Sequence, residues 1–366
     1  MNSSSNQSVP RTTRKFWKNT TLYKRLGISF LLFFIIIAIS CLLYNLGGGL
    51  SPVYLTEDWK DEISGKPYTS IYHPKYNQTQ WNVVLDGHSH TRYSHGSLTP
   101  EQNLLWHLSM GFNAMVLTDH NTFKGIEEIR NIARTQFNDS IKVLIGTEWT
   151  TRRIHMNLIL PPNATNYEHL TPPGWSVTDT EIQAIIHDTH ELGGLVVVNH
   201  YPWSETHCKN QPSRAELLAW GVDYLEVINE DVYDEISMEF AIENDLGQIT
   251  GTDMHQPGEV FGATLLNVTK FTEEEIFHQL QKQATGIFFN SSGSGYPIEH
   301  QTVKTFWSTF FAPFIALGEV TTPLFWPVPS FGSILAWIGW YYAFFFILEG
   351  IMWIPNLRER KSKKRT

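Results

Sequence analysis

The sequence predicts an α/β barrel whose two ends lead into membrane-spanning helices. Seven apolar runs with strand character recur along the middle of the chain, at 81–86, 113–118, 142–147, 153–160, 194–199, 223–229 and 248–253. Helix-start signals separate several of these runs, and most runs end in His, Asp or Glu. Buried parallel strands are typically continuous apolar runs, and their alternation with helices is typical of α/β folds. In a βα barrel the loops that follow the strands build the active site at one mouth.

The predicted helices between these strands carry start and stop signals. Each start has a Ser or Thr followed three residues later by Glu or Gln, the spacing of a capping box. These N-cap residues are Thr99, Thr178, Ser213 and Thr272. Pro100 suits the first helical position, and Gly193 is a stop signal for the helix before it. The signals support an alternation of strands with helices.

Composition and charge exclude several classes of protein. The 366 residues suit one large domain or two smaller ones, and a hydrophobic content of 42% is ample for a sizeable core. The net charge of −9 argues against a protein that coats nucleic acid. Of the two cysteines, Cys41 lies in an apolar run, so Cys208 is the only one in the soluble part. This excludes an internal disulfide framework.

Two apolar segments predict membrane-spanning helices. Leu26 to Tyr44 carries no charge, and Phe331 to Leu348 is uncharged and rich in aromatic residues. About 20 residues are enough to cross the hydrocarbon core of a bilayer. A cleaved signal peptide is the alternative for the first segment, but the apolar core of a signal peptide is usually shorter. We therefore expect two uncleaved spans.

Basic residues on the outer side of each span predict the topology. Those before the first span are Arg11, Arg14, Lys15, Lys18, Lys24 and Arg25, and residues 358–365 supply a second basic cluster. Basic flanks stay in the cytosol, so we expect both termini to be cytosolic and the middle of the chain to lie on the far side. The apolar stretch 301–330 is expected to be interfacial or re-entrant. A third span there would place the basic C-terminal tail on the wrong side.

Short motifs favour the endoplasmic reticulum. The final Lys363-Lys364-Arg365-Thr366 resembles the dilysine retrieval signal of membrane proteins of that compartment, although a generic basic flank is the alternative. Five glycosylation sequons lie between the two spans, at Asn77, Asn138, Asn163, Asn267 and Asn290. They fit a glycosylated lumenal domain. They are weak evidence, because the N-terminal tail holds three more, at Asn2, Asn6 and Asn19.

Imidazoles and carboxylates follow the predicted strands in a pattern that favours a metal site. His88 and His90 share the i, i+2 spacing that puts side chains on one face of an extended chain, and Asp253 and His255 repeat it. The further candidates are His95, His120, Glu148, His155 and His200. Solvent-facing histidine is the alternative for any one of them. Convergence of such groups from separate strands is what a metal-dependent hydrolase needs.

Other polar residues near these clusters are candidates for supporting roles. Asp119 either accepts a hydrogen bond from a ligand imidazole or caps the following helix. Arg92, Arg152 and Arg153 either hold a phosphate oxygen or are exposed surface charges. Glu226 and Asn229 end the sixth predicted strand and either support the site or touch substrate. The aromatic residues Trp149, Trp175, Tyr201 and Trp203 either line a pocket or pack in the core.

These clusters together resemble the polymerase and histidinol phosphatase (PHP) domain. The matching pieces are Asp86-Gly-His-Ser-His90-Thr, Leu117-Thr-Asp-His120-Asn, Gly146-Thr-Glu148, His155, Asn199-His200-Tyr-Pro202 and Gly251-Thr-Asp-Met-His255-Gln-Pro. The resemblance covers about residues 80–295 and neither membrane segment. It implies a distorted, TIM-like barrel of seven strands that binds two or three divalent metal ions.

The resemblance also implies a role for each candidate ligand. His88, His90, Glu148 and Asp253 would hold one metal; Glu148 would bridge to a second that His155 and His200 share; and His95, His120 and His255 would hold the third. Many relatives have Asp at the position of His95. The ligands are nitrogen and oxygen atoms without a thiolate, which suit zinc, manganese or iron. Glu148, Asp253, Asp119 and Arg92 are the residues that we expect to take part in catalysis.

Taken together, the sequence predicts a membrane-anchored, metal-dependent phosphoesterase that faces the lumen of the endoplasmic reticulum. The expected organisation is a basic tail (1–25), a span (26–46), a lumenal linker (47–79), the barrel (80–300), the apolar stretch (301–330), a second span (331–354) and a second basic tail (355–366). Tethering at both ends favours a lipid-linked or glycolipid phosphate ester as substrate, with the bilayer as a partner and no nucleic acid. A non-catalytic lumenal domain that binds metals or a phosphorylated ligand is the alternative.

Overall fold

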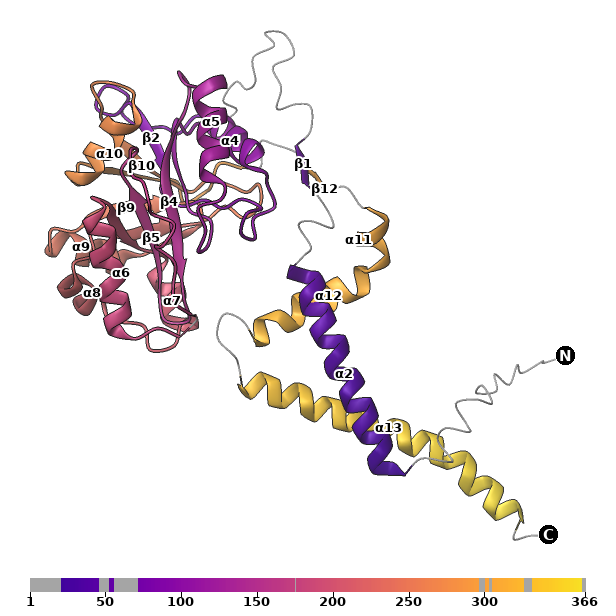
Figure 1. Cartoon of the computed structure of the whole chain (residues 1–366). Coiled ribbons are helices and arrows are strands. Elements are labelled where there is room, and N and C mark those ends of the chain that lie inside the picture. Colours follow the sequence, from indigo (N-terminus) through magenta and orange to yellow (C-terminus); the bar gives the residue numbers. More distant parts are fainter. Residues whose placement is uncertain are drawn as a thin grey trace. The chain divides into compact units, whose positions relative to one another are not determined.

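The computed structural model describes residues 21–45, 53–55, 72–174, 176–295, 300–302, 305–325 and 331–363. They divide into two compact units, a helical one (Met1–Leu46 with Phe310–Thr366) and a large one (Gly47–Thr309). Figure 1 shows the elements of both units. Most of the N-terminal basic tail, Trp175 and the last three residues of the dilysine-like end lie outside the described residues.

The large unit is built on one mixed sheet of ten strands. Its strands are β2 (Val83–Asp86), β3 (Ala114–Leu117), β4 (Lys142–Thr150), β5 (His155–Leu160), β6 (Leu195–Val198), β7 (Tyr224–Asn229), β8 (Val232–Tyr233), β9 (Gly247–Gly251), β10 (Gly262–Leu266) and β11 (Gly286–Phe289). The order along the sheet is β11-β10-β2-β3-β4-β5-β6-β7-β8, and β9 pairs with β7. A separate two-stranded sheet joins β1 (Val53–Leu55) to β12 (His300–Thr302). The predicted α/β class is confirmed.

The seven predicted strands are all present, but the expectation of parallel pairing is only partly correct. The pairs β2-β3, β3-β4, β6-β7 and β7-β9 are parallel. In contrast, β5 is antiparallel to both of its neighbours. Only four residues, 151–154, separate β4 from β5, and so short a link permits a hairpin but no parallel crossover. Strands β8, β10 and β11 were not predicted.

Backbone hydrogen bonds beyond the strand ends join β9 to β2 and curl the sheet. Gly87 N–H donates to the Thr250 carbonyl at 3.0 Å, and Asp253 N–H donates to the His88 carbonyl at 2.9 Å. A parallel bridge between Ser89 and Met254 continues this contact. The bonds lie at the segments that carry the predicted ligands, so the closure of the sheet also fixes the site. The count of seven strands in a closed barrel stays a prediction.

Helices pack along the strands of the large unit, and most of their predicted caps are confirmed. These helices are α4 (Pro100–Ser109), α5 (Ile126–Gln136), α6 (Asp179–Glu191), α7 (Tyr201–His207), α8 (Arg214–Trp220), α9 (Glu235–Glu243) and α10 (Glu273–Gln281). Reciprocal capping boxes form at Thr99, Thr178 and Ser213. At Thr272 the side chain accepts from the Glu275 N–H, which is one half of the box. Gly193 follows α6 with a φ of 73°, as a helix stop requires.

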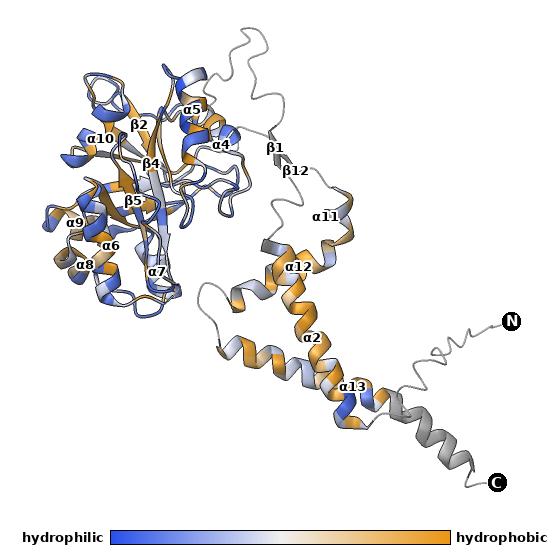
Figure 2. Ribbon diagram, viewed as in Figure 1, coloured by the Kyte–Doolittle hydropathy of each residue, from blue (hydrophilic) through white to orange (hydrophobic). Residues whose placement is uncertain are grey.

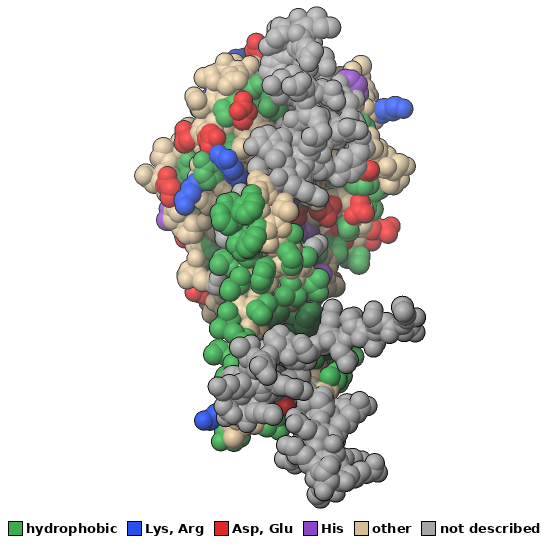
Figure 3. All heavy atoms as spheres, turned by 90° about the vertical axis from the view of Figure 1, so that its right-hand side faces the viewer, with side chains coloured by type: hydrophobic (Ala, Val, Ile, Leu, Met, Phe, Trp, Pro, Cys, Tyr) green, Lys and Arg blue, Asp and Glu red, His purple; other side chains and the backbone are tan. Residues whose placement is uncertain are grey.

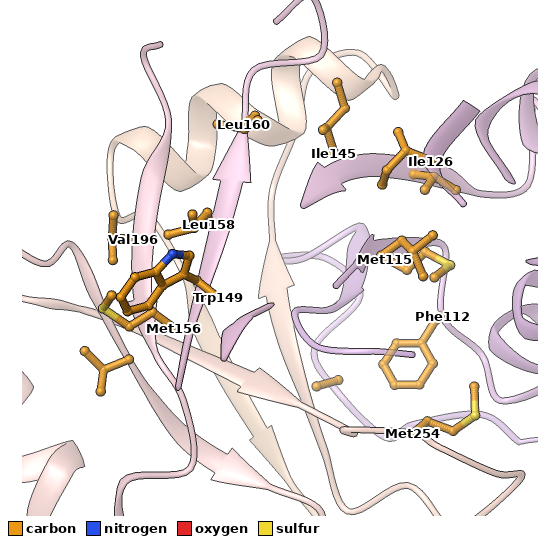
Figure 4. Close-up of a cluster of buried hydrophobic side chains, with 14 of the residues drawn as sticks. Phe112, Met115, Ile126, Ile145, Trp149, Met156, Leu158, Leu160, Val196 and Met254 are labelled. Atoms are coloured by element: carbon orange, nitrogen blue, oxygen red, sulfur yellow. The ribbon is translucent and has the colours of Figure 1, made fainter. Parts of the chain in front are cut away.

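The core of the large unit lies against both faces of the sheet. Figure 4 shows Trp149, Met156, Leu158 and Val196 packed together from three neighbouring strands. All nine residues of β4 are buried. Trp149 is 1% exposed, so its role is core packing and not pocket lining. Figure 2 shows that the strands of this unit are mostly hydrophobic, whereas many of the loops are hydrophilic.

The helical unit contains two helices that are long and apolar enough to cross a membrane. They are α2 (Leu22–Asn45) and α13 (Phe331–Lys363), whose apolar parts cover Leu22–Tyr44 and Phe331–Ile351. Large apolar side chains such as Leu31 and Trp340 are 62% and 71% exposed. In Figure 3 the hydrophobic side chains of this unit form a broad apolar surface on the face shown. These lengths agree with the two spans predicted from the sequence.

Polar contacts hold α2 and α13 side by side in opposite directions. Arg25, at the beginning of α2, donates two hydrogen bonds to the Glu349 carboxylate at 2.8 and 3.0 Å. One turn further along α2, the Ser29 hydroxyl lies 2.6 Å from the Tyr341 hydroxyl. The beginning of α2 therefore lies beside the later part of α13. This is the arrangement of a helical hairpin.

The stretch 301–330 forms short helices within its described part. These are α11 (Phe306–Phe310), α12 (Ala312–Thr321) and the 3-10 helix η2 (Thr322–Leu324). A helix of ten residues is about 15 Å long, which is too short to cross a bilayer. The α12 helix packs on α2, where Thr321 lies 3.4 Å from Cys41 and Gly318 touches the Ser40 backbone. Each of these described helices is much shorter than α2 or α13, and the interfacial or re-entrant character of the stretch stays a prediction.

We expect Leu158→Ala to destabilise the large unit. Leu158 is fully buried in β5, and a buried Leu→Ala change costs about 2–5 kcal/mol because it leaves a cavity. Thermal or denaturant unfolding of the purified chain measures the change. The matched control is Ile242→Ala in α9, where the side chain is 62% exposed and the cost should stay within about 0.5 kcal/mol. Equal effects of the two changes would contradict this core.

Candidate metal centre

The ends of the strands bring the nine predicted ligands into one region. His88 and His90 follow β2, His120 follows β3, Glu148 lies in β4, and His155 begins β5. His200 follows β6, and Asp253 and His255 follow β9. His95, in the loop after β2, stacks on His120 and lies against His255, with ring centroids 4.4 and 4.3 Å apart. The structure therefore places all nine side chains in one continuous cluster.

Glu148 lies at the centre of this cluster and is completely buried. One of its oxygens, Oε1, lies 2.9 Å from Nδ1 of His155 and 3.2 Å from Nε2 of His200. The other, Oε2, lies 2.7 Å from Nδ1 of His120 and 3.4–3.5 Å from Nε2 of His90 and His88. The two oxygens thus face different sets of imidazoles, as a bridging carboxylate requires.

Asp253 provides the second carboxylate of the cluster. Its Oδ1 lies 3.0 Å from Nε2 of His90, 3.4 Å from Nε2 of His88 and 3.5 Å from Nδ1 of His255. The backbone at Asp253 and at His200 has positive φ angles of 49° and 26°. Such conformations cost free energy in residues with a side chain, and they persist where the surroundings enforce them, commonly at functional sites.

Several buried polar atoms in the cluster have no hydrogen-bond partner among the described residues. They are Oε2 of Glu148, Oδ1 of Asp253, and ring nitrogens of His90, His120, His155 and His255. Leaving buried polar atoms unsatisfied costs free energy. Three groups have ligand atoms within 4.8 Å of one another: His90, His120 and His255; His88, Glu148 and His200; and His88, His90 and Asp253. These residues fit divalent cations that prefer nitrogen and oxygen ligands.

The electrostatics of the cluster favour ionised carboxylates. Burial alone would raise the pKa of Glu148, but the imidazoles of His120, His88 and His155 together hold its pKa well below the usual value. Burial opposes protonation of His88, yet Asp253, Glu226 and Glu148 together raise the pKa of His88 well above its usual value. The site therefore holds negative charge that attracts cations, whether protons or metal ions.

Asp119 and Arg92, two of the residues predicted to support the site, differ in their surroundings. Asp119 accepts hydrogen bonds from the Thr91 N–H at 2.7 Å and the Ser94 hydroxyl at 2.7 Å. It orders the loop before His95, and neither suggested contact, with a ligand imidazole or with a helix cap, is recorded in the part of the chain that the structure describes. Arg92 is exposed, and within the described ranges no contact of its side chain with the cluster is recorded.

The other two arginines differ from each other. Arg153 pairs with Asp179 at 2.6 Å and donates to the Val177 carbonyl at 3.2 Å, so it ties loops together. Arg152 has a buried Nε without a hydrogen-bond partner among the described residues. Arg152 is therefore the better candidate of the pair for a phosphate contact.

Sequence reasoning missed His107, which supports the site from α4. His107 and Asp86 are fully buried, and Nε2 of His107 lies 2.9 Å from Oδ2 of Asp86. Asp86 also accepts from the backbone N–H groups of His88 at 3.1 Å and Thr252 at 2.9 Å. This pair joins the segments after β2 and β9. The available signal was the buried Asp that directly precedes the His88 motif.

An exposed aromatic ring and a cavity border the cluster. Trp203 is 39% exposed, and its ring centroid lies 5.2 Å from that of His200 and 5.4 Å from that of His155. Tyr201 is buried, and its hydroxyl donates to the Pro212 carbonyl. A cavity of about 280 Å³ opens beside Asp253 and His255. Substrate thus has room to reach the cluster.

Cation binding to this cluster should weaken as the pH falls. His88 and His200 are buried, which opposes their protonation, but neighbouring carboxylates raise the pKa of both. In the cation-free protein both stay protonated above the unfolded value of about 6.5, and their stabilising contribution is lost as the pH rises through the raised pKa. A cation binds only the neutral imidazole and must displace these protons.

Chelator-competition titrations with Zn²⁺ at pH 6, 7 and 8 measure this effect. We expect the apparent affinity to rise at each step, with proton release on binding. The same affinity at all three pH values would contradict the protonation pattern described for His88 and His200.

One family model and several solved structures are similar to this chain. The family model of the PHP domain matches residues 86–253. One similar solved structure is a two-domain protein from Bacteroides vulgatus that contains a predicted PHP-like metal-dependent phosphoesterase. It is 18% identical, the match covers 59% of this chain and 70% of that chain, and the TM-score is 0.46. A second is a putative metal-dependent phosphoesterase from Bifidobacterium adolescentis, which is 17% identical, with 58% of this chain and 98% of that chain covered and a TM-score of 0.42. An amidohydrolase from Chromobacterium violaceum with bound sulfate is also similar. It is 16% identical, the match covers 56% of this chain and 97% of that chain, and the TM-score is 0.37. No curated protein matches the chain. Residues 86–253, which carry all nine candidate ligands except His255, are a PHP domain.

Proposed function

We propose that the chain is a membrane-anchored, metal-dependent phosphoesterase. The observation that carries this proposal is the buried carboxylate of Glu148, whose two oxygens face two different sets of imidazoles. A carboxylate in this position would neutralise bound cations, and the match to the PHP domain supports a metal-dependent phosphoesterase. The substrate would be a phosphate monoester or diester.

The residues present fit two or three divalent ions. His88, His90, Glu148 and Asp253 would hold one ion; Glu148, His155 and His200 a second; and His95, His120 and His255 a third. When bound, such ions activate a water molecule and polarise the phosphoryl group. Glu148 contacts His155 and His200 through one oxygen and His120 through the other. Asp253 orients His90 through the 3.0 Å contact. Arg152 is proposed to contact a non-bridging phosphate oxygen.

The fold supports this assignment of ligands. We interpret seven strands as a distorted, TIM-like barrel: β2, β3, β4, β5, β6, β7 and β9. The hydrogen bonds between residues 87–90 and 250–254 close this barrel. Strands β8, β10 and β11 would then lie outside the closed circuit. Closure of this kind brings the ends of distant strands to one mouth, where enzymes of this architecture carry their active sites.

Membrane anchoring is proposed from the two apolar helices at the ends of the PHP domain. The hairpin arrangement of α2 and α13, with Arg25 bonded to Glu349, supports two termini on the same side of the membrane. Together with the basic flanks, this favours cytosolic termini and a domain in the lumen of the endoplasmic reticulum. Anchors at both ends favour a lipid-linked or glycolipid phosphate ester as substrate.

Glu148→Gln should abolish most of the hydrolytic activity. The change keeps the shape of the side chain but removes the charge that offsets two cations. We expect kcat/KM on a panel of phosphomonoesters and phosphodiesters to fall by about two orders of magnitude or more, since even indirect support of a metal ligand is worth 10–100-fold. The assay uses the full-length chain in detergent, reconstituted with Zn²⁺ or Mn²⁺.

The control is Glu239→Gln, an exposed position in α9, which should leave the activity unchanged. A wild-type protein that is loaded with metal but hydrolyses none of the esters would favour the non-catalytic alternative, a metal- or phospholigand-binding domain. Equal activity of wild type and Glu148→Gln would refute the role of Glu148.

The proposed topology has its own test. Tags at both termini should be accessible to antibody or protease from the cytosolic side of intact microsomes, and the PHP domain should be protected. Glycosylation at Asn138 or Asn267, detected by glycosidase treatment, would agree with a lumenal domain. A lumenal C-terminal tag with a cytosolic N-terminal tag would contradict the two-span arrangement and indicate an additional crossing.

A further inference from the structure

One buried carboxylate outside the nine candidate ligands touches two of them. Glu226 lies in β7 and is 2% exposed. Its Oε1 lies 2.9 Å from Nδ1 of His88, and its Oε2 accepts a hydrogen bond from the His200 N–H at 2.7 Å. His88 and His200 follow different strands, β2 and β6. A single side chain thus contacts two separate segments that carry candidate ligands.

Asn229 extends this contact to a third segment. Its side-chain amide donates to Oε2 of Glu226 at 3.1 Å and lies 3.4 Å from Oδ2 of Asp253. Asp253 follows β9 and is the second carboxylate of the centre. Glu226 and Asn229 therefore join the segments after β2, β6 and β9 from outside the cluster.

The hydrogen-bonding partners of Glu226 assign the tautomer of His88. A carboxylate oxygen accepts hydrogen bonds, so Nδ1 of His88 carries the hydrogen that it donates to Oε1 of Glu226. In the neutral ring this leaves Nε2 with a free lone pair. That nitrogen faces the cluster, 3.4 Å from Oδ1 of Asp253 and 3.5 Å from Oε2 of Glu148. A ligand imidazole must present its lone pair in this direction.

The local backbone makes room for Glu226. A Cβ atom at Gly251 would overlap Oε1 of Glu226 and Cβ of His88, so only glycine permits the carboxylate to approach the ring. The bond from the His200 N–H to Glu226 also holds His200 in its positive φ of 26°. Gly251 and the backbone of His200 therefore both permit the approach of Glu226 to His88.

We propose that Glu226 is a positioning residue, which fixes the Nδ1–H tautomer of His88 and the backbone of His200 and thereby sets the affinity for metal at both. The inference rests on the metal centre of the proposed function. Residues that orient metal ligands in this way commonly change metal affinity by 10–100-fold when they are replaced.

Glu226→Gln is the direct test, because glutamine has the same shape but only one acceptor oxygen. The His88 Nδ1–H, the His200 N–H and the Asn229 amide all donate toward Glu226, so the new NH₂ group must face a donor. Either His200 loses its acceptor, or His88 changes tautomer and its Nε2 becomes protonated. We expect the Kd for Zn²⁺ of the full-length chain to rise by about 10–100-fold.

The thermal unfolding of the same proteins separates positioning from a general structural role. In chelator-stripped protein, Glu226→Gln should melt below the wild type, because a buried donor loses its acceptor. The decisive readout is the rise in Tm caused by Zn²⁺, which should be much smaller in the variant than in the wild type. Glu239→Gln, the exposed control in α9, should match the wild type in both states. A variant that binds Zn²⁺ like the wild type would overturn the proposal.

A second measurement needs no Glu226 variant. In full-length wild type labelled with ¹⁵N-histidine, the ring signals of His88, assigned by their loss in His88→Asn, should show a protonated Nδ1 and a Zn²⁺-bound Nε2. An unprotonated Nδ1 would overturn the proposal even if Glu226→Gln fails to fold. A wild type that binds no Zn²⁺ at all would instead refute the metal centre itself, and with it the proposed function.

Discussion

The burial of the Glu148 carboxylate among five imidazoles is the constraint on which the rest of the site depends. A carboxylate without solvent contact is costly unless opposite charge or hydrogen-bond donors surround it. Here the surrounding imidazoles come from segments after β2, β3 and β6 and from the beginning of β5. Glu148 can be accommodated only if all these segments converge. The curled sheet, its closure through residues 87–90 and 250–254, and the positive φ angles at His200 and Asp253 serve this convergence.

Much of this site could be predicted from the sequence because the candidate His, Asp and Glu ligands lie at or near the ends of apolar strands. Each of the seven predicted strands is present, and the candidate ligands that follow them lie together in space. The antiparallel course of β5 was not foreseen, although the four-residue link at 151–154 demands it. Strands β10 and β11 are followed by Asn267 and Asn290 and not by a candidate ligand, so the polar residues that mark the ends of the other strands are missing there.

The contacts that support the ligands are harder to predict, since they depend on packing between segments far apart in the chain. His107 meets Asp86 only because α4 folds back over β2, and its sequence surroundings resemble any amphipathic helix. Asp119 and Arg153 have the residue types of a catalytic site, yet they order loops. The ion pair between Arg25 and Glu349 joins residues 324 positions apart. Composition and basic flanks predict two apolar helices that run in opposite directions, but only the structure shows the contacts that join them.

The roles proposed for the other residues all depend on one property of the molecule: the cluster around Glu148 binds metal ions. Elemental analysis of the purified full-length chain, after reconstitution with Zn²⁺ or Mn²⁺ and removal of loosely bound ions, tests it directly. We expect at least two metal ions per chain, which are lost together when Glu148 is replaced. A folded chain that retains no metal under these conditions would contradict it.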